Sequence, residues 1–270
     1  MGDARPIPGF VVSLMVQNAM STIGRMFDSI EGLAERVILV DSGSTDGTRE
    51  YARSRGAEVV ERAWGGNVAQ RQASIDVCGN ARWILLLDAD ESLEPPLAAA
   101  LRVALERDDP AIAGYEINRT LWFHGEALGH VCQPEWRLRL VRGGRARAAG
   151  VVPHDRIELH SQGSTERGRI ERLHGDLRHD SWSSAEDMLR RQLSHARAAS
   201  LHDSRGGSLL QILVSPSAAF LKQFVLRRGF LDGRRGLIAS SGIAAATLMK
   251  HILAAERKIP PSPGRPDHLP

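Results

Sequence analysis

The sequence predicts an α/β fold, in which helices cover both faces of a mostly parallel sheet and a helical extension follows at the C-terminus. Short, continuous apolar runs at residues 10–16, 37–40 and 83–87 have the length and the β-branched side chains of buried strands. Segments with helical spacing separate these runs, and buried strands that alternate with helices form parallel sheets. With 270 residues, 42% of them hydrophobic, the chain can bury a full core.

The remaining elements of the first half follow from local patterns of apolar residues. Helical spacing is clearest at residues 22–33, where apolar side chains recur every three or four positions. We expect helices at residues 22–33, 46–55, 67–77 and 93–107, and a short strand at residues 58–61. A helix then lies between each pair of successive strands, as the crossover connections of a parallel sheet require.

The rest of the chain changes character twice. Residues 113–178 are rich in glycine and histidine and predict a loop-rich, partly antiparallel section against the edge of the sheet. Short strands are expected at residues 115–120, 137–141 and 156–160, and helices at residues 184–201, 208–226 and 237–256. The proline-rich tail at residues 259–270 is expected to be disordered.

Composition excludes several classes of protein. The net charge is +3, and all but three of the basic side chains are arginines. Two cysteines, Cys78 and Cys132, are too few for a disulfide framework and indicate a reducing compartment. No signal peptide is evident, and the uncharged stretches at residues 208–221 and 236–249 are shorter than a membrane span of roughly 18 residues. We therefore expect a cytoplasmic protein without a spanning helix, and the absence of Gly-Lys and Gly-x-Gly excludes the common nucleotide loops.

Carboxylates follow two of the predicted strands. Asp41 ends the strand at residues 37–40, and Asp88, Asp90 and Glu91 follow the strand at residues 83–87. Ligands of parallel sheets bind at the carboxyl ends of the strands. Three acidic groups so close together repel one another unless a cation or a donor-rich ligand is present, and Mg²⁺ takes one or two carboxylates together with phosphate oxygens. This pattern favours a metal-diphosphate site, with a solvated turn as the alternative; for Asp41 the alternative is a turn or helix cap.

Several strings of residues, in a fixed order, resemble the family 2 glycosyltransferases. The first half contains Val40-Asp-Ser-Gly-Ser-Thr-Asp-Gly-Thr48, Trp64-x-Gly66, Gln70-Arg71-Gln72-x-Ser74 and Leu87-Asp-Ala-Asp-Glu91. The second half contains Phe123-x-Gly125, Arg137-Leu138-x-Leu140, Val152-x-His154-Asp155, His179-x-Ser181 and Arg228-Gly-Phe-Leu-Asp-Gly233. These later strings are similar to the lipopolysaccharide core glucosyltransferases, and the match extends roughly over residues 11–253.

The resemblance implies a GT-A fold, which is Rossmann-like, a nucleotide-sugar donor with UDP-glucose favoured, Mg²⁺ or Mn²⁺, and inversion at the anomeric carbon. Residues 8–112 would then bind the donor, residues 113–182 would bind the acceptor within the same domain, and residues 183–258 would form the helical extension. The donor nucleotide is assigned by the resemblance to Ser13, Asn18, Asp41, Ser42, Arg71 and Asp88, and the metal to Asp90 and His179. Where relatives have an Asn-Glu pair, this chain has Asn18-Ala19.

Inverting transfer needs a general base that takes a proton from the acceptor hydroxyl. Asp155 is the first candidate because it lies where the family carries an acidic pair, and its neighbour His154 could act as the base instead or orient it. The alternative for both is a turn beside a strand, and for His179 a buried, hydrogen-bonded histidine. His130 and Trp136 are expected to contact the acceptor, although core packing is the commoner fate of a tryptophan.

The helix predicted at residues 208–226 combines apolar residues with a basic end. A helix of this kind can lie in a membrane interface, and a packed helix pair or a homodimer contact is the alternative. The chain would then be cytoplasmic, with attachment to the cytoplasmic face of the inner membrane as the option that the helix raises. We expect a lipopolysaccharide-core or other lipid-linked saccharide as acceptor and no nucleic-acid partner. Transfer to a polyprenyl phosphate and a non-catalytic, sugar-nucleotide-binding protein are the competing functions.

Overall fold

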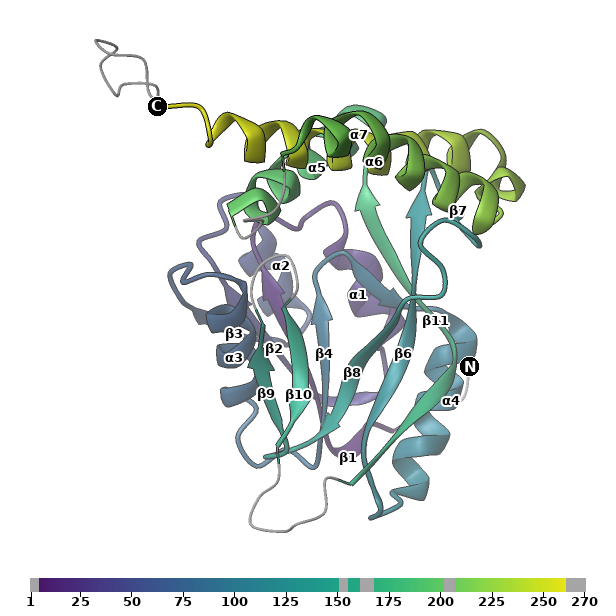
Figure 1. Ribbon diagram of the computed structural model, residues 1–270. Helices are drawn as coiled ribbons and strands as arrows, with labels where there is room; N and C mark the ends of the chain where they lie inside the picture. The colour runs from purple at the N-terminus through teal and green to yellow at the C-terminus, as the bar shows by residue number, and fades with distance from the viewer. Residues whose placement is uncertain (1–4, 151–154, 161–167, 202–206, 261–270) are drawn as a thin grey trace. The chain divides into compact units, whose positions relative to one another are not determined.

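A computed structural model describes residues 5–150, 155–160, 168–201 and 207–260 of the chain (Figure 1). The chain forms two compact units, the first of Met1–Ala127 and Pro134–Ser181 and the second of Leu128–Gln133 and Trp182–Pro270. The loop at Leu128–Gln133 thus groups with the C-terminal helices, although the sequence suggested that it belongs to the acceptor section. Most of the proline-rich tail lies outside the described residues.

The first half of the first unit is the predicted alternation of strands and helices. The strands are β1 (Ile7–Val16), β2 (Ala34–Asp41), β3 (Glu58–Glu61) and β4 (Trp83–Asp88), and the helices are α1 (Ile23–Ser29), α2 (Thr48–Ser54), α3 (Asn67–Asp76) and α4 (Pro95–Arg107). The strands pair in parallel in the order β3-β2-β1-β4. The carboxyl ends of β1, β2 and β4 therefore meet at one edge, which is where a ligand of such a sheet binds.

The sheet continues beyond β4 with strands that run antiparallel. These are β8 (Trp136–Arg142), β6 (Ile112–Phe123), β11 (Arg169–Trp182) and β5 (Glu91–Leu93), in that order, with β7 (Glu126–Ala127) paired to β6. The partly antiparallel middle section is confirmed, and the sheet is mixed. The strand β11 was not predicted, because its charged and polar residues hide the two buried leucines, Leu173 and Leu177.

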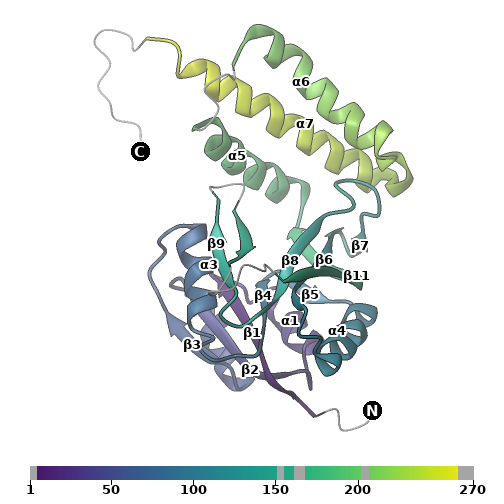
Figure 2. The ribbon, with the colours of Figure 1, turned by 60° about the horizontal axis from the view of Figure 1, so that its bottom comes forward.

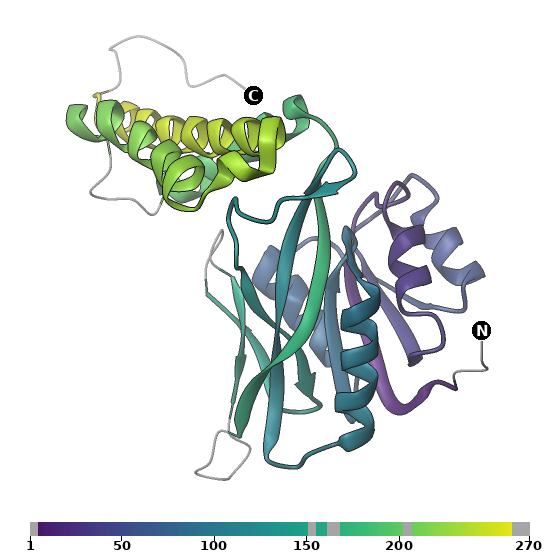
Figure 3. The same ribbon diagram turned by 90° about the vertical axis from the view of Figure 1, so that its right-hand side faces the viewer.

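Two apolar layers cover the sheet. On one face, α1 and α4 pack on residues such as Leu14 and Leu87. On the other face, α3 and a separate two-stranded sheet, β9 (Ala146–Ala149) with β10 (Arg156–Leu159), pack on residues such as Val11 and Leu86. Figure 3 shows the sheet from its side, with α4 lying along one face. Alternate residues of β1 and β4 thus enter different cores, which explains their continuous apolar runs.

The second unit is helical. It contains α5 (Ala185–Leu201), α6 (Leu209–Leu221), a π-helical turn at Lys222–Leu226, a short 3₁₀ turn at Gly229–Asp232 and α7 (Gly233–Glu256). The helix α7 packs against both α5 and α6, so it lies between them (Figure 2). Gly242 allows the close approach of α7 to α5, because a Cβ at this position would lie 2.5 Å from the Cε atom of Met188.

Two helical stretches in the described part of the chain are long and apolar enough to cross a membrane by length and composition. They are Leu209–Leu226 and Gly229–Glu256, with mean hydropathies of 1.5 and 1.4. Both are longer than the uncharged stretches at residues 208–221 and 236–249, because the sequence expectation ended each stretch at the first charged residue and the helices continue past it. The expectation that no segment reaches this length is therefore corrected.

Candidate functional site

Hydrogen bonds tie the loop after β1 to the loop after β2. The Asn18 side-chain Oδ1 accepts the N–H of Thr45 at 2.9 Å, and the Asn18 N–H donates to the Ser44 hydroxyl at 2.9 Å. Asn18 has a φ of 51°, a left-handed conformation that asparagine tolerates better than most residues. The N–H of Ala19 donates to the Thr48 hydroxyl at the start of α2. Asn18 therefore holds the carboxyl ends of the two strands in one arrangement.

Asp41 shapes the turn that follows β2. Its buried carboxylate accepts the N–H groups of Gly43 and Ser44 at 3.0 and 2.9 Å, and also the Ser44 hydroxyl. The turn-forming role left open by the sequence is thus what the structure shows. Ser42 connects this turn to α3, because its hydroxyl accepts a hydrogen bond from the Gln70 amide at 2.9 Å. Ser13, by contrast, lies fully buried within β1 and does not reach the edge of the sheet.

Arginines neutralise the acidic cluster after β4. Arg139 of β8 pairs with the Asp88 carboxylate at 2.8 Å and with buried Glu91, and Arg71 of α3 pairs with the other Asp88 oxygen. Burial alone would raise the pKa of Asp88, but the neighbouring guanidinium groups outweigh it and hold that pKa well below its usual range. The repulsion expected within the acidic cluster is relieved at Asp88 and Glu91 by arginines of the chain itself.

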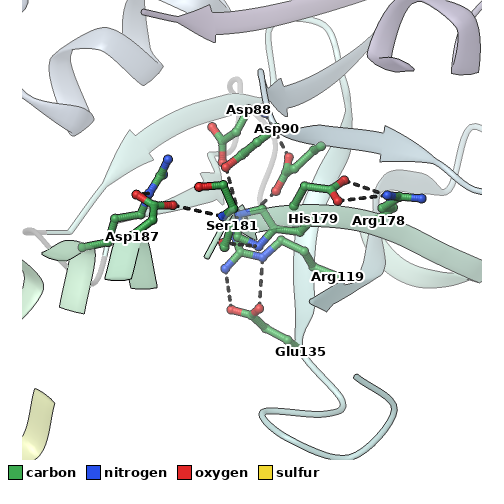
Figure 4. Close-up of polar contacts among 12 residues, drawn as sticks. Asp88, Asp90, Arg119, Glu135, Arg178, His179, Ser181 and Asp187 are labelled. Carbon is green, nitrogen blue, oxygen red and sulfur yellow. Dashed lines mark hydrogen bonds and ion pairs between the residues drawn. The ribbon is translucent and has the colours of Figure 1, made fainter. Parts of the chain in front are cut away.

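Arg119 extends the same network to the antiparallel strands. Its guanidinium binds both oxygens of Glu135, at 2.8 and 3.0 Å, and lies 3.5 Å from Glu91 (Figure 4). The pairing lowers the pKa of Glu135 against the opposing effect of burial. Paired charges at this depth fix each other in position, so Asp88 has a defined orientation while 27% of its side chain stays exposed.

Asp90 and His179, the two residues that the resemblance assigns to a metal, lie side by side. The strands β5 and β11 pair antiparallel with His179 opposite Glu91, and the N–H of Asp180 donates to the carbonyl oxygen of Asp90 at 3.0 Å. This register places the Nε2 atom of His179 3.5 Å from the Asp90 carboxylate (Figure 4). The Ser181 hydroxyl lies 2.8 Å from the same nitrogen.

This pair fits a divalent cation in its chemistry and spacing. Two ligand atoms that bind one ion at about 2.1 Å are separated by roughly 3 Å or more, which the 3.5 Å distance between Asp90 and His179 satisfies. Within the described residues no group of three histidine, cysteine or acidic side chains could hold a metal. The described residues thus offer two ligands there, and the other positions around an ion would go to phosphate oxygens and water.

The predicted acceptor residues have different settings. Asp155 is half-buried and directly precedes β10, while His154 lies outside the described residues. Trp136 begins β8, and the guanidinium of Arg172 lies over its ring at 4.4 Å from the centroid. One face of this ring is therefore already in contact with a cation. His130 belongs to the second unit, where its Nδ1 atom lies 2.9 Å from Asp232.

Several residues of these networks escaped the sequence reasoning. Arg139 and Arg119 alternate with apolar positions on long strands, and each meets acidic partners that are distant in the sequence. Asp232 stands inside the string Arg228–Gly233, which was noticed only as part of a resemblance. Arg139 stands between Leu138 and Leu140 in a predicted strand, and this alternation of a charged residue with leucines is the signal that could have identified it.

A comparison with models of protein families identifies one family for this chain. The family described as Glycosyl transferase family 2 matches residues 12–148. The chain is 25% identical over 245 residues to an uncharacterized glycosyltransferase of Rickettsia prowazekii, covering 88% of this chain and 83% of that one. It is 30% identical over 172 residues to the lipopolysaccharide core biosynthesis glycosyltransferase LpsC of Rhizobium meliloti, covering 59% and 62%. The solved mannosyl-3-phosphoglycerate synthase from Rubrobacter xylanophilus aligns with 18% identity and a TM-score of 0.46 over 72% of this chain and 73% of that one.

Proposed function

Because this chain belongs to glycosyl transferase family 2 and is a glycosyltransferase, we propose that it performs inverting, metal-dependent transfer of a hexose to a lipid-linked saccharide. Glucose carried by uridine diphosphate is the proposed donor, and an acceptor of the lipopolysaccharide-core type is favoured by the similarity to LpsC. The observation that carries the proposal is the Asp90–His179 pair beside the arginine-held Asp88, next to the carboxyl end of β4. The α/β architecture agrees with the GT-A fold that the resemblance implied.

The donor nucleotide would bind along the tied ends of β1, β2 and β4. Asp88 keeps its charge because two arginines surround it, so its exposed edge can accept hydrogen bonds from ribose hydroxyls. Arg71 brings positive charge to the same place. Asn18 and the Asp41 turn, with Ser42, would shape the base-binding end, whereas buried Ser13 would act only by supporting β1.

Asp90 and His179 would hold the Mg²⁺ or Mn²⁺ ion. When bound there, such an ion supplies Lewis-acid stabilisation of the charge that develops on the leaving diphosphate. The chain contributes the placement of the two ligands, because the pairing of β5 with β11 sets the imidazole beside the carboxylate. Ser181 would orient the ring through its contact with Nε2 in the absence of the ion.

Asp155 is the proposed general base. Its carboxylate would accept the proton of the acceptor hydroxyl as the new glycosidic bond forms, and a half-buried position suits a base that must meet the acceptor. His154 is the alternative base. We keep His130 and Trp136 as proposed contacts for the saccharide. No disulfide joins Cys78 and Cys132, which suits a reducing compartment, and we propose that the reaction takes place on the cytoplasmic side of the inner membrane.

Transfer from radiolabelled nucleotide sugars to lipid-linked acceptors, with and without Mn²⁺, tests the function. We expect Asp90→Asn and His179→Ala to lower kcat/KM by about 100-fold, the size of effect seen when one charge-stabilising group is removed. Glu106→Gln on α4 is the matched control, since this carboxylate is exposed and pairs only locally with Arg102. Undiminished transfer by Asp90→Asn, or full activity in excess chelator, would disprove the metal-dependent mechanism. A lipopolysaccharide core and a polyprenyl phosphate, offered side by side, separate the two acceptor classes.

A further inference from the structure

The outward face of α6 and of the π-helical turn that follows it is apolar. Seven large side chains form this face, which we call the α6 stripe: Leu209, Leu210, Leu213, Val214, Leu221, Val225 and Leu226. Leu209, Leu210 and Leu213 are 74%, 70% and 65% exposed, and Leu226 is 79% exposed. The exposed positions recur in adjacent pairs every four residues, so they form one continuous side of the helix.

The polarity of α6 is the reverse of an ordinary surface helix. Its side toward the rest of the unit carries Gln211, Ser215 and Gln223 among its apolar residues, and none of the residues at Leu209–Leu226 is buried. A core helix of a soluble protein can match it in length and composition, but such a helix is mostly buried. Contiguous apolar surfaces of this kind mark sites that bind a partner or a membrane.

The helix α5 of the same unit provides an internal comparison. Its exposed positions include Glu186, Arg190, Arg191 and Arg197, and two of these residues form an ion pair across one helical turn. The chain therefore covers one flank of α7 with a charged surface and the other flank with an apolar one. The stripe is therefore a feature of α6 that α5 does not share.

Positive charge accompanies the stripe. Residues 208–260 contain eight lysines and arginines but only two carboxylates, Asp232 and Glu256. Asp232 is engaged by the backbone N–H groups of Gly129, His130 and Val131. Five of the cations lie between the end of α6 and the first turn of α7, at Lys222, Arg227, Arg228, Arg234 and Arg235. Cations next to an exposed apolar face complement an anionic lipid surface, to which each basic residue contributes about 1 kcal/mol.

The packing of the three helices decides between lying on a bilayer and crossing it. The stretch Leu209–Leu226 is about 27 Å long at 1.5 Å per residue, so its length alone would permit a crossing. However, α6 is packed on α7, and α7 is packed on α5 with its exposed arginines. Crossing would carry charged α5 into the hydrocarbon or would strip α7 of this partner, and both are costly. A position on the bilayer surface instead brings the stripe to the lipid and leaves the arginines of α5 out of the hydrocarbon.

We propose that the α6 stripe is a monotopic membrane-binding surface for anionic lipid. The axis of α6 lies in the plane of the bilayer interface, the leucines and valines enter the upper acyl region, and the cations from the end of α6 to the first turn of α7 contact the headgroups. The proposal adds a lipid-binding surface to the proposed glycosyltransferase and does not depend on which sugar is transferred.

Vesicle flotation of the full-length protein tests the proposal. The wild type is expected to float with phosphatidylcholine vesicles that contain 30% phosphatidylglycerol, and several-fold less with pure phosphatidylcholine. Leu210→Gln with Leu213→Gln, on the stripe, should lower the floating fraction at least five-fold. The matched control is Leu189→Gln with Leu201→Gln on α5, which removes two leucines of 49% and 68% exposure and should float like the wild type. Lys222→Gln with Arg234→Gln should abolish the preference for the anionic vesicles.

Three results would overturn the proposal. The first is failure of the wild type to float with anionic vesicles, or equal loss in the α5 control. The second is retention in membranes after alkaline carbonate extraction, which would indicate a spanning hairpin. The third is a wild type that forms a dimer by light scattering and does not bind vesicles, together with a stripe variant that is monomeric. A second copy of the chain would then cover the stripe in place of lipid. Circular dichroism of each variant checks that it is folded. We expect folded variants because the substituted positions are exposed.

Discussion

Asp232, at the end of the 3₁₀ turn before α7, holds His130 in place. The carboxylate of Asp232 accepts the backbone N–H groups of Gly129, His130 and Val131 at 3.0, 3.1 and 3.0 Å, and it lies 2.9 Å from the Nδ1 atom of the His130 ring. Because a carboxylate only accepts hydrogen bonds, the Nδ1 atom of the ring is the donor in this contact. One aspartate thus holds both the backbone of the loop at Leu128–Gln133 and the ring of its histidine.

Asp232→Ala should release this loop. Hydrogen bonds to a charged group are worth about 1.5–3 kcal/mol each, and the variant loses all of them at once. We expect amide hydrogen exchange at residues 129–131 to accelerate at least ten-fold, measured by mass spectrometry of the peptide that covers them. Glu256→Gln, at an exposed carboxylate of the same unit, is the control and should leave exchange unchanged. Unaltered protection in Asp232→Ala would mean that other contacts hold the loop.

Arg139 should be one of the most sensitive residues for stability. Arg139→Met leaves Asp88 and Glu91 with less compensation in a buried setting, and removal of one partner from a buried ion pair costs about 3–5 kcal/mol. Urea denaturation should show this loss, whereas Arg137→Met on the same strand, where the arginine is 41% exposed, should change stability by less than about 1 kcal/mol.

A second substitution distinguishes lost charge compensation from lost packing at Arg139. Glu91→Gln added to Arg139→Met removes one of the uncompensated charges, so we expect the double variant to regain part of the stability. If it were no more stable than Arg139→Met alone, packing rather than charge would explain the loss.

Asp155→Asn should impair catalysis without impairing donor binding. Loss of a general base lowers kcat by about 10²–10⁴-fold, while the affinity for the nucleotide, measured by titration calorimetry with UDP, should stay within two-fold. Glu158→Gln is the neighbouring control, since Glu158 on β10 pairs with Arg147 and Arg156. His154→Ala in the same assay identifies the base: a larger effect there than in Asp155→Asn would transfer the role to the histidine.

The two cysteines should differ in reactivity. Burial raises the pKa of the Cys78 thiol to about 11, so it is neutral at pH 8, whereas Cys132 is partly exposed. Iodoacetamide at pH 8 should modify Cys132 and leave Cys78 intact until denaturant is added, as read by mass spectrometry. Cys132→Ser should then show no labelling in the native state, and equal labelling of both thiols in the wild type would contradict the buried position of Cys78.

The raised pKa of Cys78 also makes the stability of the fold depend on pH. The folded state keeps the thiol proton to higher pH than the unfolded state, whose thiol pKa is about 8.5. The contribution is therefore complete below that pH and is lost as the pH rises toward 11. Cys78→Ala should remove this alkaline sensitivity, which thermal melts between pH 8 and pH 10.5 would detect.

The sequence was most informative where elements depend on local pattern. The strand at residues 58–61 coincides with β3. The strands before Asp41 and Asp88 end where expected, because buried parallel strands are continuous apolar runs. The strand β11 was missed because one of its faces is polar. A strand of this kind is stabilised by its partners in the sheet, which its own residues do not reveal.

The sequence indicated which residue types form the candidate site, but it did not indicate which of them form ion pairs. Asp90 and His179 were identified as a pair from resemblance, and their contact depends on a strand register between β5 and β11 that spans almost ninety residues. The role of Arg139 depends on the fold in the same way, since it meets Asp88 only when β8 pairs with β4. Long-range pairing of this kind has no local signature.

The anchor at Asp232 has a consequence for synthesis of the protein. His130 leaves the ribosome 102 residues before Asp232, which at 5–20 residues per second is a delay of roughly 5–20 s. During this interval Asp232 has not been synthesised, so its carboxylate is not there to bind the segment at Leu128–Gln133. The second unit therefore cannot form until the later part of the chain has been made. A chain that stops after residue 181 would contain the segment at Leu128–Gln133 without the aspartate that binds it. A shortened enzyme would therefore have to omit this segment together with the C-terminal helices.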